Sequence, residues 1–375
     1  MRVAIVHDWL VTFAGAEKVL AELFEIWPDA ELFSVIDFLS DEDRLKIKGK
    51  VATTTFIQKL PKAKDKYKIY LPLMPIAIEQ LDLRGFDLVL SSSHAVAKGV
   101  IVGPDQLHIC YCHSPIRYAW DMQSQYLSES GLATGLKGLI ARRLLFNVRN
   151  WDSRSASGVD YFISNSNYIG RRIDKVYRRC STTIYPNVAV EEFSVVEDKD
   201  DFYLTASRMV PYKKMDLIVR AFAGMPDKRL VVIGDGPQFS KVLRDATPNV
   251  QVLGYQPFEV LKDHMQRAKA FVFAAEEDFG IIPVEAQACG TPVVAYARGG
   301  ALETVIDGHT GVFFKEQNEE SIQEAIKRFE ETFVAHPVQI RAHAEGFSTT
   351  VFRARLTEFV EEKLKDFFSF TKNEQ

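Results

Sequence analysis

The chain has 375 residues, of which 47% are hydrophobic and 26% charged, and its net charge at pH 7 is −4. This length allows two hydrophobic cores, because single cores stop growing near about 250–300 residues. No apolar run approaches the roughly 18 residues that cross a bilayer, and the opening MRVAIVHDWL is typical of a strand rather than a secretory signal. We therefore expect a cytoplasmic protein.

Neither cysteines nor paired carboxylates predict a metal site. A disulfide framework is not expected in a chain of this size, and the Cys110-Tyr-Cys112-His113 segment lacks a second ligand pair at matching spacing. Asp198-x-Asp200 formally resembles the metal-binding DxD of another transferase class, but it lies in a charged linker before a predicted strand. We interpret it as a solvated turn and predict no metal and no cofactor.

The chain begins with a predicted strand over 2–6 and a helix over 16–26, joined by a loop of small residues that contains Gly15. A strand, a small-residue loop and a helix start can point backbone N–H groups at a phosphate. One glycine is a weak signal, and an ordinary turn explains it equally well.

Further strands are predicted over 31–36, 88–91 and 108–112, with helical or irregular segments between them. This βαβ series predicts a doubly wound parallel sheet. His113, Arg117 and Asp121 follow the strand that ends at Cys112, at the edge where open α/β sheets bind ligands. They form either a polar site or ordinary structural contacts.

Two segments of the first half, 59–70 and 136–154, are rich in basic residues. The second has helical period, with Leu136, Ile140, Leu144, Val148 and Trp151 on one face and Arg142 and Arg149 roughly opposite. One interpretation is a helix whose apolar face packs on the core. The other is contact with an anionic membrane surface, to which each cation would contribute about 1 kcal/mol.

The second half repeats the strand–helix pattern after an acidic linker. A strand over 201–206 is followed by Arg208 and Lys213, which flank a proline turn before a helix. A forked guanidinium and a compact ammonium suit a diphosphate. As surface charges the two residues would be unremarkable.

The segment Phe271–Pro292 joins a buried strand to a loop and a two-turn helix that contains Pro283. It holds Glu277 in the loop and Glu285 in the predicted first turn of the helix. Taken singly, Glu285 complements the helix dipole and the acidic loop is a solvated turn.

Taken together, these motifs resemble those of the retaining glycosyltransferases of family 4. Glu277 and Glu285 fall on the two glutamates of its E-x7-E signature, with FG after the first and CGTPVV behind the second. Arg208 and Lys213 match the family's R-x-x-x-x-K diphosphate clamp, and LVVIGDG is a phrase of family members. YCHSPIRYAWD resembles the loop of a mannosyltransferase-like subgroup that makes bacterial O-antigen and exopolysaccharide.

The resemblance implies the α/β GT-B fold, in which two Rossmann-like doubly wound domains face a central cleft. We expect an acceptor-side domain over 1–195, a nucleotide-sugar domain over 196–345 and a final helix over 346–375 that crosses back to the first domain. The expected activity is metal-independent, retaining hexosyl transfer, with mannose from GDP-mannose as the preferred donor and a lipid-linked glycan as the acceptor.

The resemblance also implies roles for individual residues. Arg208 and Lys213 hold the diphosphate, Glu277 and the Phe279–Gly280 backbone hold the sugar, and Glu285 binds the ribose. The further substrate-binding residues are Gly15, Arg117 and Asn187, while His113 positions sugar and acceptor. Alternatives are a UDP-sugar donor, a sugar-nucleotide epimerase or a non-catalytic partner subunit.

Overall fold

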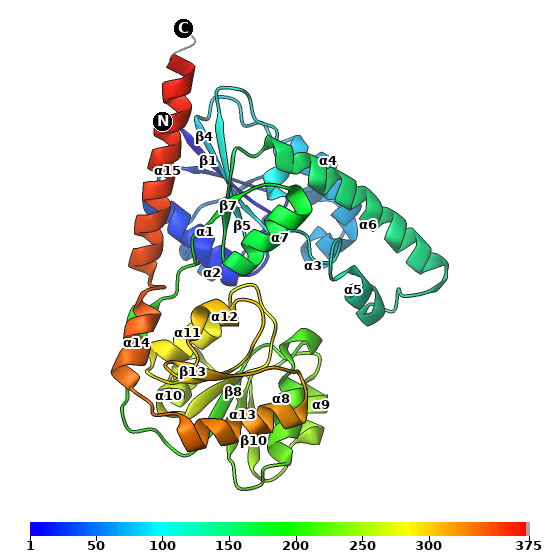
Figure 1. Ribbon diagram of the computed structural model, residues 1–375. Helices are drawn as coiled ribbons and strands as arrows, with labels where there is room; N and C mark the ends of the chain where they lie inside the picture. Colours follow the sequence, from blue (N-terminus) through cyan, green and yellow to red (C-terminus); the bar gives the residue numbers. More distant parts are fainter. Residues whose placement is uncertain (373–375) are drawn as a thin grey trace. The chain divides into compact units, whose positions relative to one another are not determined.

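The computed structural model describes residues 1–372, without the side chains of 129 and 370–372 (Figure 1). The chain forms two compact units. The first contains residues 1–185 and the chain from Arg353 onward, and the second is Pro186–Phe352. The division falls after 185 rather than 195 because the intervening residues pack in the second unit, where Val188 forms a bridge with Ser348. The chain likewise returns at 353 rather than 346.

The first unit is built on a parallel seven-stranded sheet with the order β3-β2-β1-β4-β5-β6-β7. Every residue of β1, β4 and β5 is buried, which explains their continuous apolar and small-residue composition. The strand order reverses between β1 and β4, and such a point commonly binds ligands. The strands are β1 Val3–His7, β2 Glu31–Ser34, β3 Thr53–Thr54, β4 Leu88–Ser93, β5 Leu107–Cys112, β6 Tyr161–Ser164 and β7 Ser181–Thr183.

The helices of the first unit are α1 Gly15–Ile26, α2 Asp41–Leu45, α3 Ala63–Lys66, α4 Met74–Glu79, α5 Gln123–Glu129, α6 Gly135–Ser155 and α7 Asn167–Tyr177. The long helix α15, Thr349–Lys372, joins them from Arg353 onward. Leu356 and Val360 of α15 are buried, and Phe359 packs edge-to-face on Tyr161 of β6 at 6.4 Å between ring centroids. From Arg353 onward the chain therefore packs with the first unit.

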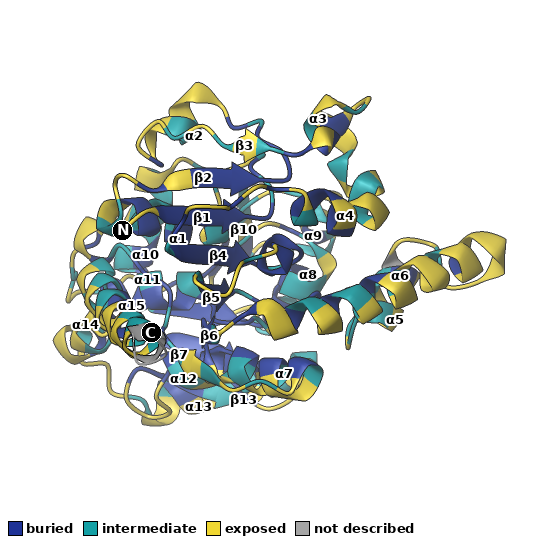
Figure 2. Cartoon of the chain, turned by 90° about the horizontal axis from the view of Figure 1, so that it is seen from above, coloured by how far each residue is buried: buried dark blue, intermediate teal, exposed yellow. Residues whose placement is uncertain are grey.

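The core-facing interpretation of the basic helix is wrong for its first half. Val148 of α6 is buried, but Leu136, Ile140 and Leu144 are 73%, 53% and 38% exposed. Figure 2 shows α6 running from the buried sheet out to an exposed end. Helical period identifies the shared face of these residues, but it does not tell how far along the helix the supporting core extends.

The second unit repeats the architecture with a parallel six-stranded sheet, ordered β10-β9-β8-β11-β12-β13. Its order reverses between β8 and β11, which pair through Tyr203 and Ala270. The strands are β8 Tyr203–Ala206, β9 Leu230–Ile233, β10 Val250–Gly254, β11 Ala270–Phe273, β12 Val293–Tyr296 and β13 Gly311–Phe314. The helices are α8 Met215–Ala223, α9 Phe239–Asp245, α10 Phe258–Arg267, α11 Ile281–Ala288, α12 Ala301–Thr304, α13 Glu319–Thr332 and α14 Pro337–Glu345. The predicted pair of Rossmann-like units is confirmed.

Candidate active site

In the second unit, the basic and acidic residues of the two motifs meet at the reversal of strand order. Lys213 ends the 3-10 turn Pro211–Lys213 that follows β8, and Glu277 lies in the loop after β11. Their side chains form an ion pair, with exposed fractions of 15% and 17%. Two residues 64 positions apart are thus held together at one sheet edge.

Arg208 lies at the same edge, in the loop after β8. This loop contacts the Gly-x-Gly turn that follows β9. The N–H of Met209 donates to the carbonyl of Asp235 at 2.8 Å. A Cβ at Gly234, whose φ is +139°, would lie 1.9 Å from the carbonyl oxygen of Ser207. The glycine lets the two loops touch, and Arg208 itself is exposed.

The Glu277 loop packs on a second pair of glycines, Gly299 and Gly300. The N–H of Gly300 donates to the carbonyl of Glu277 at 2.8 Å. A Cβ at Gly300 would lie 2.3 Å from the Cα of Phe279. This backbone contact holds the Glu277 loop in place. The Gly-Gly pair followed by a short helix was the feature of the sequence that could have indicated it.

Glu285 lies in the second turn of α11, not the first, because the helix begins at Ile281. Complementing the N-terminal dipole therefore does not explain this carboxylate. Lys199 donates from Nζ to the carbonyl of Cys289 at 3.0 Å, and Arg341 donates to that of Ala288 at 2.8 Å. The two cations satisfy carbonyls at the end of α11, and burial lowers the pKa of Lys199 to about 8.

Phe279 and Asn187, two further substrate-binding candidates of this unit, have buried side chains. The ring of Phe279 is buried and packs on Phe347 at 5.6 Å between centroids, so it leaves only its backbone for a ligand. Asn187 is also buried, next to Val188, whose N–H donates to the carbonyl of Phe347 at 2.9 Å.

In the first unit, His113 follows β5 at the carboxyl edge of the sheet. Its Nε2 lies 2.8 Å from Oγ of Ser92, and its backbone N–H donates to the carbonyl of Ser93 at 2.8 Å. Burial, followed by the neighbouring His94 and His7, holds the pKa of His113 well below its usual range. The ring is therefore neutral near pH 7.

His94 and Asp8 belong to the same cluster and were not singled out from the sequence. Asp8 is fully buried and accepts hydrogen bonds from the backbone N–H groups of 94–97 at 2.6–3.0 Å. Its Oδ2 lies 3.0 Å from Nδ1 of His94, whose ring centroid is 6.4 Å from that of His113. Only tertiary structure brings these groups together, since they follow different strands.

The other candidate residues of the first unit each have different surroundings. Arg117 is partly buried. Burial is the main cause that lowers the pKa of His94, and the positive charge of Arg117 is a smaller cause in the same direction. Asp121 forms an ion pair with Arg172 of α7 and so has a structural partner. Gly15 is the exposed first residue of α1, and the loop before it is closed by Glu17, which accepts from the N–H of Ala14 at 3.0 Å.

Among residues 1–372, no group of three or more histidine, cysteine, aspartate or glutamate side chains is arranged to hold a metal ion. Asp200 of the DxD sequence instead accepts a hydrogen bond from Arg267 at 2.7 Å. Of the helices that the structure describes, none has the length and apolar character needed to span a bilayer.

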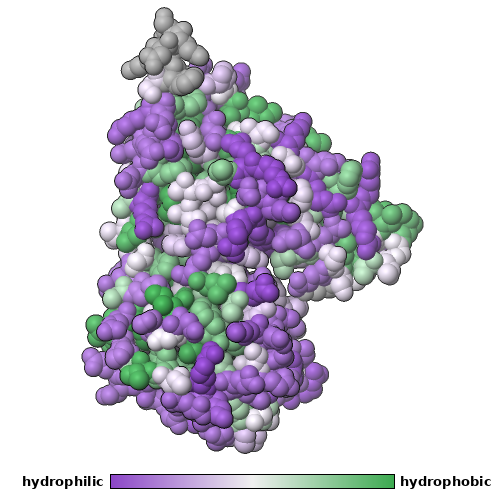
Figure 3. Space-filling view, in the orientation of Figure 1, coloured by the Kyte–Doolittle hydropathy of each residue, from purple (hydrophilic) through white to green (hydrophobic). Residues whose placement is uncertain are grey.

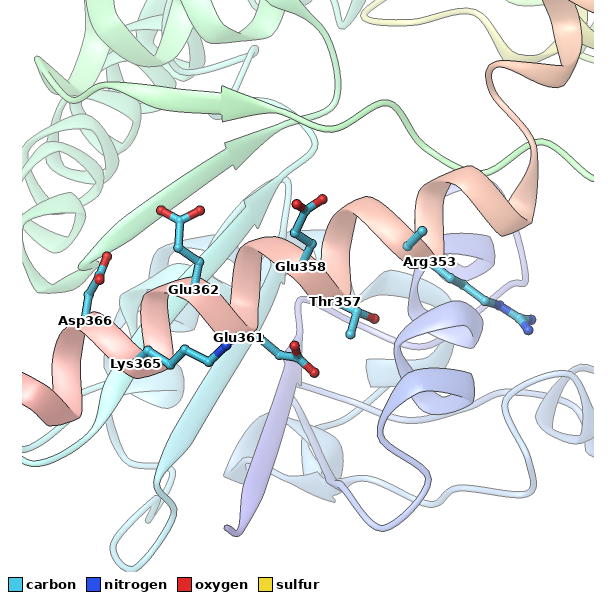
Figure 4. A pocket seen from close by; sticks show the side chains of 8 residues that line it. Arg353, Thr357, Glu358, Glu361, Glu362, Lys365 and Asp366 are labelled. Carbon is cyan, nitrogen blue, oxygen red and sulfur yellow. The ribbon is translucent and has the colours of Figure 1, made fainter.

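A hollow of about 620 Å³ lies along the exposed side of α15 (Figure 4). Glu358 and Glu362 point to one side of the helix while Glu361 points to the other, so these carboxylates do not converge. Its lining comes from a single helix. The switch-point edge of each sheet, rather than this hollow, is the candidate site of its own unit.

Comparison with known proteins bears on the fold and on the sequence of the second unit. Residues 187–339, most of the second unit, match the family of glycosyl transferases group 1. HepE of Anabaena, solved in complex with UDP-glucose, superposes with a TM-score of 0.68 at 17% identity, over 96% of this chain and 100% of that chain. The protein thus has the fold of GT-B glycosyltransferases, and its second unit matches the group 1 family over residues 187–339.

Two curated relatives are similar over parts of the chain. An uncharacterised glycosyltransferase of Methanocaldococcus jannaschii is 29% identical over 51% of this chain and 54% of its own length. A GDP-mannose-dependent alpha-(1-6)-phosphatidylinositol monomannoside mannosyltransferase of Mycolicibacterium smegmatis is 34% identical over 32% of this chain and 36% of its own. The chain therefore spans about half or less of the relatives that it matches.

Proposed function

We propose that the protein is a retaining, metal-independent glycosyltransferase that moves a hexose, preferentially mannose from GDP-mannose, onto a lipid-linked glycan of bacterial surface polysaccharide synthesis. The observation that carries the proposal is the Lys213–Glu277 pair at the β8/β11 reversal, with Arg208 at the same edge. A departing diphosphate needs fixed positive charge, and a sugar with developing positive charge needs polar groups beside it.

In this proposal Arg208 and Lys213 hold the two phosphates in place of a metal ion. Lys213 is already bound to Glu277, so the ammonium and the carboxylate are oriented before any substrate arrives. Glu277 and the Phe279–Gly280 backbone take the sugar hydroxyls, and Glu285 takes the ribose. The acceptor attacks from the face that the phosphate leaves, and the phosphate oxygen accepts the acceptor's proton.

The first unit supplies hydrogen-bonding groups. His113 positions sugar and acceptor through a hydrogen bond, because its low pKa keeps the ring uncharged. Backbone N–H groups near Gly15, at the start of α1, are available to the diphosphate. Arg117 of the first unit and Asn187 of the second unit complete the proposed binding residues.

The choice of GDP-mannose rests on the YCHSPIRYAWD segment and on the name of the mycobacterial relative. HepE was solved with UDP-glucose, so a UDP-sugar is the competing donor. An epimerase of the same fold and a silent partner subunit are the remaining alternatives.

Incubation of the purified protein with GDP- and UDP-sugars and a bacterial lipid extract separates these possibilities. We expect GDP release and mannose incorporation into lipid with retained anomeric configuration. An epimerised sugar nucleotide would establish the epimerase instead. Absence of turnover with every donor would leave only the partner subunit and would overturn the proposal.

A lipid-linked acceptor places the protein at the cytoplasmic membrane surface, and α6 suits that contact. Leu139 and Phe146 are 65% and 44% exposed, on the same outer arc as Leu136, Ile140 and Leu144. At 100° per residue, Lys137 and Arg142 flank this arc and Arg143 lies within it. Figure 3 shows apolar surface at this end of α6.

The basic segment 59–70 is a second candidate for this contact. Lys62, Lys64, Lys66 and Lys68 are exposed together with Ile69, which is 67% exposed. An anionic lipid surface fits both the cations and the apolar side chains between them.

Sedimentation with vesicles tests the membrane contact. We expect binding to phosphatidylglycerol-containing vesicles and little binding to pure phosphatidylcholine. Replacing Lys137, Arg142 and Arg143 by Gln should weaken it by about 100-fold, at about 1 kcal/mol per cation. Leu243→Ser changes an exposed leucine of the second unit and serves as the matched control. Equal binding of the triple variant and wild type would contradict the contact.

A further inference from the structure

Four polar side chains of the first unit form a continuous line that ends at His113. Oε1 of Glu17 lies 3.3 Å from Nε2 of His7, and Nδ1 of His7 lies 3.1 Å from Oγ of Ser92. The same Oγ lies 2.8 Å from Nε2 of His113. The line crosses from α1 through β1 and β4 to the end of β5.

We propose that Glu17 is a positioning residue whose carboxylate sets, through His7 and Ser92, which ring nitrogen of His113 carries the proton. The role of His113 in holding a substrate hydroxyl rests on the proposed glycosyl transfer. The direction in which the hydrogen bonds of this proton line donate does not depend on the proposed function.

The direction follows from what each group can donate. In the proposed arrangement His7 carries a single proton. An ionised carboxylate only accepts, so Nε2–H of His7 donates to Glu17, and Nδ1 of His7 accepts. The single hydroxyl proton of Ser92 then points at His7. Its oxygen is left to accept from Nε2–H of His113. Nδ1 of His113 therefore has a lone pair and accepts a hydrogen bond from a hydroxyl group.

Burial keeps the line intact. His7 and Ser92 are completely buried and Glu17 is 5% exposed, so water does not compete for these contacts. Burial raises the pKa of Glu17, whereas the hydrogen bonds from His7 and from the backbone N–H of Ala14 lower it and favour the ionised carboxylate. The other rings beside His113 are His94 and Tyr111, at 6.4 and 5.1 Å between centroids.

The second oxygen of Glu17 connects this line to the loop before α1. Oε2 accepts the N–H of Ala14 at 3.0 Å. One carboxylate therefore closes the proposed phosphate-binding loop and orients the proposed hydroxyl-binding histidine. The arrangement makes Glu17→Gln an informative change, because the amide has only one oxygen.

In Glu17→Gln the oxygen is required by Ala14, so the amide NH2 faces His7 and donates to Nε2. His7 must then carry its proton on Nδ1 and donate to Ser92. The hydroxyl of Ser92 turns to donate to Nε2 of His113, and His113 is left with the proton on Nδ1. An isosteric substitution 10 residues from His7 in sequence is thus expected to exchange the tautomer of His113.

Nitrogen-15 NMR of histidine-labelled protein measures this directly, with the signals of His113 assigned by their loss in His113→Gln. We expect the Nε2–H tautomer in wild type and the Nδ1–H tautomer in Glu17→Gln. Glu22→Gln, on the same helix but paired with Arg353, should leave the wild-type tautomer unchanged. A wild-type Nδ1–H tautomer would overturn the proposal even if the variant failed to fold, as would an unchanged spectrum in folded Glu17→Gln.

Activity provides the second measurement. Glu17→Gln should lower kcat for transfer by up to about tenfold, the scale of one hydrogen bond, with little change in the KM of the donor. Loss of donor binding in this variant would contradict a role through His113. If wild type transfers no sugar, the proposed function fails, whereas the NMR result still decides the direction of the proton line.

Discussion

The two units place polar side chains at the same topological position, yet they fill it with different chemistry. The edge beside β8 and β11 carries an ion pair and an exposed arginine, whereas the edge beside β1 and β4 carries a histidine cluster hydrogen-bonded to buried serine and carboxylate groups, with a neutral His113 at its end. A diphosphate needs fixed charge, while sugar and acceptor hydroxyls need directional hydrogen bonds. In the proposed function, this difference is a division of labour in which the second unit binds the charged part of the donor.

The largest expected effect comes from breaking the charged site. Lys213→Ala and Glu277→Ala should each reduce turnover by about 100-fold or more, the scale for losing one preorganised polar group. The double variant should lose much less than the product of the two effects, because each residue orients the other. Lys327→Ala, an exposed lysine of α13, is the control. Turnover near that of wild type in either single variant would refute the assignment.

We expect acid to destabilise the first unit more than the second. Burial lowers the pKa of His108, in β5, to about 4, while its Nε2 lies 2.8 Å from Oγ of Ser91. The unfolded chain therefore takes up the proton first, and stability is lost as the pH falls from about 6.5 toward 4. The loss reaches about 3 kcal/mol at the lower limit, and the buried neutral His94 and His113 act in the same direction.

Hydrogen exchange of β5 and β9 between pH 7 and pH 5 tests this difference. We expect protection in β5 to fall first and His108→Gln to reduce that pH dependence. Earlier loss of protection in β9 would show that acid sensitivity does not lie in the buried histidines.

A smaller effect is expected from His113→Gln. Turnover should fall by up to about tenfold, because one neutral hydrogen bond is lost, while the Kd for GDP stays at the wild-type value. A variant that lost nucleotide binding would place His113 with the charged groups and remove the contrast between the units.

Much of the fold followed from local patterns. Apolar runs such as Phe271–Ala275, the proline near the start of α11 and the apolar face of α1 at Val19 and Leu23 predicted elements that the structure contains. The motifs also brought Lys213 and Glu277 together correctly, because each follows a strand and the strands are neighbours.

What could not be predicted depends on contacts between distant segments. The Asp8–His94 contact joins two strands that are adjacent only in the folded sheet. The fit of Gly300 under Phe279 requires the real backbone separation. The exposure of Leu136 depends on where the supporting core ends, and the unit boundary depends on which side residues 186–195 pack.

Calorimetric titration with nucleotides tests the central claim most directly, since it needs no acceptor. If Arg208 and Lys213 hold a diphosphate, GDP should bind at least about tenfold more tightly than GMP, and this preference should disappear in Arg208→Ala and Lys213→Ala. The same titration with UDP and UMP identifies the preferred base. Equal binding of diphosphates and monophosphates to wild type, or a preference that survives both substitutions, would contradict the account.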